Sequence, residues 1–148
     1  MQRVVITGLG IWSCLGTTLE EVREALYAGK SGIVLDLVRK EMGFRSGLTA
    51  RVPVPELKKE LPRPLRAYMS EPAQYAYCAT RDALRHARID QDYLDSHEVG
   101  LLYGNDSTAD AVYRHFSKIV EKKDTMLCGS GAIFQSMNST VTMNLGVI

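Results

Sequence analysis

Cysteine is scarce in this sequence. Cys14, Cys78 and Cys128 lie far apart, form no C-x-x-C pair, and are not at metal-ligand spacing from any of the three histidines. An odd number of widely spaced cysteines argues against a disulfide framework and against a zinc site. We therefore expect no bound metal, and a reducing, cytoplasmic setting.

The sequence also lacks an excess of charge of either sign. Its 18 lysines and arginines nearly balance 17 aspartates and glutamates, which leaves a formal net charge of +1. The chain therefore has no excess of positive charge that would attract nucleic acid or an anionic membrane surface. No apolar run approaches the roughly 20 residues that a membrane-spanning helix needs. We therefore expect neither nucleic acid nor a membrane among its partners.

What remains is typical of a globular domain. The chain has 148 residues, of which 45% are hydrophobic and 24% are charged. A chain of this length forms about one domain and buries roughly two-thirds of its unfolded surface. We treat residues 1–148 as a single domain.

The hydrophobic pattern predicts two buried strands, over residues 3–9 and 99–104, with a short strand or two between residues 30 and 66. Four helices are expected: one capped by Thr17 or Thr18 and closed by Gly29, one starting after Ser70, and two over residues 110–122 and 132–145. This order of strands and helices predicts an α/β layered fold.

The second of these helices carries small side chains close to one face. The residues concerned are Ala76, Ala79, Ala83 and Ala87. Small side chains allow another backbone to approach closely, so we expect this helix to be deeply packed. In the first helix, Leu19, Val22 and Leu26 fall at helical spacing and are expected to face the core.

The first predicted strand runs into closely spaced glycines, in the stretch VVITGLGIWSCLG over residues 4–16. A dinucleotide-binding loop needs G-x-G-x-x-G, but Ser13 stands where the third glycine belongs and the helix starts late. A secretion signal ending in a lipid-modified Cys14 is disfavoured, because Gly8 and Gly10 interrupt its apolar core. The simplest interpretation is close packing at a strand end, and no cofactor is expected. A Rossmann-type cofactor-binding module stays as an alternative.

Five motifs in order resemble one family. They are residues 3–10 followed by Gly29–Ile33, then Phe44–Gly47, Arg66–Ser70 with the alanine-rich helix, Val99–Gly104, and Phe134–Met137 through Met143–Leu145. Together they resemble the N-terminal part of a β-ketoacyl-acyl-carrier-protein synthase of the elongating class I/II type. The resemblance covers nearly the whole chain. One departure is Gly104–Ser107, where the family usually has a glycine-rich turn.

The resemblance implies an α/β, thiolase-like fold, of which this chain is an incomplete N-terminal half. It also implies that the parent protein extends an acyl thioester by decarboxylative condensation with malonyl-carrier protein, in fatty-acid or polyketide-type biosynthesis. Acyl carrier protein is the implied partner, and a homodimer the implied assembly. A non-catalytic accessory subunit of the chain-length-factor type is the alternative from a non-enzyme class.

In the family, a cysteine at the N-terminus of a buried helix is the nucleophile, and two histidines from the second half assist it. That cysteine follows the helix matching residues 132–145, and this chain ends at Ile148. We therefore assign no catalytic residue and expect the chain alone to be inactive. Its three cysteines are expected to be small buried hydrophobes, and His86 to lie on a solvated helix face.

The resemblance also suggests two residues near an acyl tunnel or dimer interface. They are Phe134 and Met137, in the segment before the family's nucleophile. Ordinary core packing is the alternative for both, because apolar residues at helical spacing are core by default.

Overall fold

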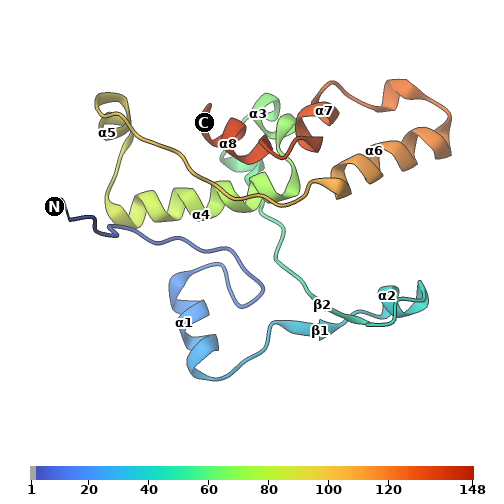
Figure 1. The fold of residues 1–148 in the computed structure, drawn as a ribbon, viewed down its shortest axis with the longest axis horizontal. Helices are drawn as coiled ribbons and strands as arrows, with labels where there is room; N and C mark the ends of the chain where they lie inside the picture. Colours follow the sequence, from blue (N-terminus) through green and yellow to red (C-terminus); the bar gives the residue numbers. More distant parts are fainter. Residues whose placement is uncertain (1–2) are drawn as a thin grey trace. The chain divides into compact units, whose positions relative to one another are not determined.

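The computed structural model describes residues 3–148 (Figure 1), which divide into two compact units. The first unit combines the chain up to Val54 with Cys78–Asp90, and the second combines Pro55–Tyr77 with Gln91–Ile148. Helix α4 (Glu71–Ala87) contributes its first turns to the second unit and its remainder to the first. The predicted start of this helix is confirmed, since the Ser70 hydroxyl accepts a hydrogen bond from the Ala73 N–H at 3.4 Å.

Helix α1 (Leu19–Tyr27) begins with the predicted capping box. The Thr18 hydroxyl accepts from the Glu21 N–H at 3.2 Å, while the Glu21 carboxylate accepts from the Thr17 and Thr18 N–H groups. These backbone bonds, led by that from Thr17, lower the pKa of Glu21. The capping stabilisation is therefore present above the ordinary pKa of a glutamate and is lost as the pH falls through the lowered one.

The end of α1 also follows the prediction, but its buried face differs. Gly29 adopts a φ of +62°, a left-handed conformation that glycine reaches without strain. Val22 and Ala25 form the buried face, whereas Leu26 is mostly exposed. The expectation that Leu26 faces the core is wrong, because the buried stripe runs through positions three apart and leaves Leu26 on its flank.

The predicted short strands between residues 30 and 66 are present. Strands β1 (Ile33–Leu35) and β2 (Leu48–Ala50) pair antiparallel, with Ile33 opposite Ala50 and Leu35 opposite Leu48. Between them lies α2 (Leu37–Glu41), whose first N–H groups donate to Asp36. Arg51 pairs with the same carboxylate at 3.0 Å and lowers the pKa of Asp36.

The two long strands expected over residues 3–9 and 99–104 are not strands in the structure. Neither range is paired to another backbone segment anywhere in residues 3–148. Both carry highly exposed apolar side chains, such as Val4 at 95% and Leu102 at 99% exposure. The correction has a simple physical reason: a β-strand exists only when a neighbour accepts and donates its ladder of hydrogen bonds.

The glycines after the first of these segments meet helix α4. A Cβ on Gly8 would lie 2.2 Å from the carbonyl oxygen of Ala83, and one on Gly10 would lie 1.8 Å from that of Ala79. Only glycines allow the backbone to cross the helix at this distance. The expectation of close packing by the glycines is confirmed, and another backbone does approach the alanine face. The expectation that this face is deeply packed holds only for Ala76, because Ala79, Ala83 and Ala87 are half-buried.

The second unit is helical. Besides the start of α4 it contains α3 (Arg63–Tyr68), α5 (Gln91–Ser96), α6 (Ala109–Lys122), α7 (Gly131–Ser136), α8 (Thr140–Leu145) and the short 3₁₀ turns η1 (Leu57–Lys59) and η2 (Thr125–Leu127). Its core includes Leu57, Leu61, Met69, Ala111 and Val141. No helix within residues 3–148 is long and apolar enough to span a membrane.

The single helix expected over residues 132–145 is instead two short helices, α7 and α8. Met137 between them has an extended backbone, with φ −82° and ψ 138°. Asn138 and Ser139 follow at once, and such side chains favour helix ends over helix interiors because they compete for backbone hydrogen bonds. The apolar pattern concealed this break.

Candidate functional site

The two residues singled out from the sequence, Phe134 and Met137, both belong to the α7 region of the second unit. The Phe134 ring stands edge-on to the ring of Tyr68, with centroids 5.1 Å apart and an interplanar angle of 89°. Phe134 is 36% exposed and Met137 is 42% exposed. Neither side chain is fully buried, so each leaves apolar area exposed, and Phe134 does so beside the ring of Tyr68.

Helix α7 is held against the C-terminal end of α3. A Cβ on Gly131 would lie 2.4 Å from the carbonyl oxygen of Ala67, so the two backbones touch at the first residue of α7. The last carbonyls of a helix have no partner within it. The Gln135 amide donates to the Ala67 carbonyl at 2.8 Å, and the Asn144 amide donates to that of Tyr68 at 3.4 Å.

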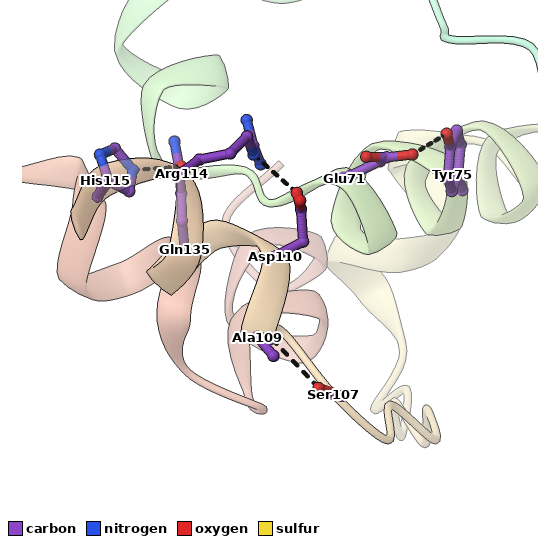
Figure 2. A network of polar contacts seen from close by, with 8 residues as sticks. All are labelled: Glu71, Tyr75, Ser107, Ala109, Asp110, Arg114, His115 and Gln135. Carbon is purple, nitrogen blue, oxygen red and sulfur yellow. Dashed lines mark hydrogen bonds and ion pairs between the residues drawn. The ribbon is translucent and has the colours of Figure 1, made fainter. Parts of the chain in front are cut away.

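A second connection joins α7 to α6. The Nε2 atom of His115 lies 3.1 Å from the Oε1 atom of Gln135, as Figure 2 shows. Gln135 therefore contacts α3 through one end of its amide group and α6 through the other. This residue carries no sequence signal, because a glutamine within an apolar helical pattern does not reveal what its amide will contact.

The segment that departs from the family pattern, Gly104–Ser107, and the residue that follows it both bind the α7–α8 region. The Thr108 hydroxyl donates to the main-chain carbonyl of Ser136 at 2.5 Å, and the Asn105 amide donates to that of Asn138 at 3.0 Å. These two bonds fix the two residues on either side of Met137.

A cavity of about 210 Å³ lies where the first turns of α4 and α6 meet. Its lining includes Ser70, Glu71, Tyr75, Thr108, Asp110 and Arg114. Arg114 pairs with Asp110 at 2.7 Å, and the Tyr75 hydroxyl donates to the Glu71 carboxylate (Figure 2). Its charged groups are therefore largely engaged with one another.

Burial, reinforced by the Glu71 carboxylate, raises the pKa of Tyr75 well above that of an ordinary tyrosine. We expect Tyr75 to keep its proton after exposed tyrosines have ionised, because the phenolate would lose solvation and face a carboxylate. An alkaline titration followed by tyrosinate absorbance checks this, because Tyr75 should ionise in a late step at high pH. Tyr75→Phe should remove this late step, and Glu71→Gln should move it to lower pH. Tyr113→Phe, on an exposed position, is the matched control and leaves the late step unchanged.

The three cysteines differ in burial. Cys78 is buried as expected, but Cys14 and Cys128 are only half-buried, because they lie in irregular segments at the edge of the packing. Within residues 3–148, no three of the histidine, cysteine, aspartate and glutamate side chains gather as a metal site would require.

His86 is exposed, as expected of a solvated helix face, yet it also holds the N-terminal segment. Its Nδ1 atom accepts a hydrogen bond from the Leu9 N–H at 3.0 Å. The neighbouring Gly8 and Gly10 face carbonyl oxygens of α4 at very short distance. A phosphate placed against these glycines would meet oxygen atoms of like partial charge, so the geometry does not favour the Rossmann-type alternative.

Comparison with known proteins gives a consistent result. Residues 1–147 match the family described as "Beta-ketoacyl synthase, N-terminal domain". A crystal structure of a β-ketoacyl synthase from Burkholderia phymatum superimposes with a TM-score of 0.82 and 28% identity, over 99% of this chain and 36% of that one. The ishigamide ketosynthase/chain length factor superimposes with a TM-score of 0.72 at 22% identity, which shows a shared fold.

Curated relatives agree with the family. The 3-oxoacyl-[acyl-carrier-protein] synthase 1 of Buchnera aphidicola (subspecies Acyrthosiphon pisum) is 35% identical over 106 residues, and that of Escherichia coli K12 is 33% identical over 106 residues. Each of these alignments covers 71% of this chain and 26% of the relative, so the chain matches about a quarter of their length. The family match extends over nearly all residues of the chain, and the thiolase-like fold and the ordered motifs agree with it. This chain therefore belongs to the β-ketoacyl synthase family and corresponds to the family's N-terminal domain.

Proposed function

We propose that this domain serves a 3-oxoacyl-[acyl-carrier-protein] synthase, which condenses malonyl-carrier protein with an acyl thioester and releases carbon dioxide. The observation that carries the proposal is the match of residues 1–147 to the N-terminal domain of β-ketoacyl synthases. The names of the curated relatives support the acyl carrier protein as the partner. The domain contributes scaffold and surface to this reaction, and we assign no catalytic residue within it.

Within this function, Phe134 and Met137 form an acyl-contact or dimer surface. Support comes from their partial exposure and from the Tyr68 ring that backs Phe134. Burying these side chains against a flexible acyl chain, or against the apolar face of a second subunit, is favourable. The free energy falls by about 25 cal/mol per Å² of apolar area removed from water. We further propose that the functional assembly is a homodimer.

A chimeric enzyme tests the proposal. Residues 1–148 replace the corresponding part of the Escherichia coli 3-oxoacyl-[acyl-carrier-protein] synthase 1, and 3-oxoacyl product is measured by mass spectrometry. We expect the chimera to condense acyl and malonyl groups, and the 148-residue chain alone to form no product. A folded, soluble chimera that forms no product, beside an active unaltered relative, would contradict the proposal.

Truncation of the surface residues separates the acyl role from the dimer role. In the chimera, Phe134→Ala or Met137→Ala should lower kcat/KM for long acyl chains about fivefold to tenfold relative to short ones if the surface contacts the acyl chain. If it lies between subunits, the same variants should shift the sedimentation equilibrium toward monomer. Val112→Ala, an exposed apolar residue on α6, is the matched control.

A further inference from the structure

We propose that Gln135 is the positioning residue of the Phe134–Met137 surface, acting through His115 of α6 and the main-chain carbonyl of Ala67 in α3. The inference rests on the proposed function, which gives that surface its acyl or dimer role. It concerns what holds the surface in place, so the NMR experiments on it do not depend on whether acyl groups bind.

Helix α7 cannot hold its own position. It has six residues, and Ser130 at its N-cap makes no side-chain capping bond. Isolated helices of this length are not stable in water, because nucleation costs more than so few hydrogen bonds return. The orientation of α7 therefore depends on the contacts its side chains make with α3 and α6.

The orientation of the Gln135 amide follows from its partners. Its neighbour at 2.8 Å is the carbonyl oxygen of Ala67, which only accepts, so the amide must present its N–H there. The amide oxygen then faces His115 at 3.1 Å, and the His115 Nε2 atom must carry a proton.

The position of this contact explains why it orients the surface. Gln135 lies four residues after Gly131, and both meet α3 at the same Ala67 carbonyl. Residues four apart lie on one face of a helix, so this face of α7 is anchored at two points one turn apart. Phe134 is adjacent to Gln135 and its ring meets Tyr68, the residue after Ala67. Anchoring Gln135 on Ala67 thus sets Phe134 against Tyr68.

The experiment uses the full chain and NMR spectroscopy. In the wild type, the His115 ring nitrogens should show the signature of a fixed Nε2–H, and the Phe134 and Tyr68 ring protons should show cross-relaxation. Gln135→Ala should abolish the Phe134–Tyr68 cross-peaks and let His115 sample both tautomers. Gln135→Glu keeps the acceptor for His115 but loses the donor to Ala67, so it should retain the His115 signature while losing the cross-peaks.

Variants of the partner separate positioning from general stability. His115→Phe should weaken the cross-peaks, whereas His115→Gln, which supplies an amide N–H in a similar place, should restore them. Gln91→Ala removes an exposed glutamine bond on α5 and should change neither signal. Cross-peaks and a His115 signature that persist in Gln135→Ala would overturn the inference, as would failure of His115→Gln to restore what His115→Phe loses.

The two proposals fail separately. The NMR result decides the positioning role: the wild type should show the fixed His115 tautomer and the Phe134–Tyr68 contact, and Gln135→Ala should lose both. With that result the positioning role stands, even if Phe134→Ala does not change the acyl selectivity of the chimera. If acyl selectivity depends on Phe134 but is unchanged by Gln135→Ala in the same chimera, the positioning role is overturned and the proposed function stands.

Discussion

Replacing Gly10 with alanine should destabilise the first unit by roughly 3 kcal/mol or more, a large fraction of the stability of a small domain. The added Cβ would lie 1.8 Å from the Ala79 carbonyl oxygen and 2.6 Å from the Ala83 nitrogen. Both are backbone atoms of a helix, so no side-chain rotation relieves the overlap. The N-terminal segment must separate from α4, which also breaks the bond between Leu9 and His86.

Urea unfolding of Gly10→Ala, together with hydrogen exchange of the amides over residues 79–87, checks this expectation. Gly104→Ala is the matched control, because a Cβ there meets no atom within 4 Å, and its effect should stay within about 0.5 kcal/mol. Shortening Ala79 to glycine should not rescue the variant, since the overlap is with the carbonyl oxygen and not with the methyl group. An unchanged unfolding midpoint would mean that residues 8–12 do not cross α4 at this distance.

Asn144→Asp should destabilise the second unit by roughly 3 kcal/mol at neutral pH. Asn144 is 2% exposed, and its amide nitrogen donates to the Thr140 carbonyl at 2.6 Å and to the Tyr68 carbonyl at 3.4 Å. A carboxylate there is buried, donates nothing and faces two carbonyl oxygens. The change removes the bond that α8 makes to the Tyr68 carbonyl of α3 and adds a buried charge.

The effect of Asn144→Asp should depend on pH in a definite direction. Burial and the facing carbonyls would raise the pKa of the introduced carboxyl in the folded state, so its penalty grows as the pH rises above about 4 and levels off beyond the raised pKa. Thermal unfolding between pH 4 and 8 measures this. Asn138→Asp, at an exposed position where only the main-chain carbonyl is used, is the control and should show almost no change. A parallel pH dependence of the two variants would contradict the account of Asn144.

The sequence predicted helix starts and ends correctly where the residues that form them lie only a few positions apart. The capping box at Thr18 and Glu21, the helix start at Ser70 and the left-handed Gly29 all lie as predicted. Each depends on residues a few positions apart, which contact one another as soon as the helix forms. The spacing of small residues on α4 likewise predicted that another backbone would approach it.

The errors arose where a partner distant in the sequence decides the outcome. Residues 3–9 and 99–104 have strand-like composition, but strand pairing requires a neighbour that composition does not supply. The apolar pattern over residues 132–145 indicated one helix, and the structure places Met137 in an extended backbone between two. Here the Thr108 hydroxyl and the Asn105 amide bind the carbonyls on either side of it.

By itself the sequence determined the family and the positions of helices α1, α4 and α6, and it proposed Phe134 and Met137 as candidate surface residues. Ordered motifs and residue spacing are properties of the chain alone, so they are readable without coordinates. The tertiary structure decided that Gln135 and Asn144 bind the end of α3 and that Gly10 lies against Ala79. These contacts join residues about 68 to 76 positions apart, and a hydrogen bond or a steric overlap depends on distances that only the folded chain defines.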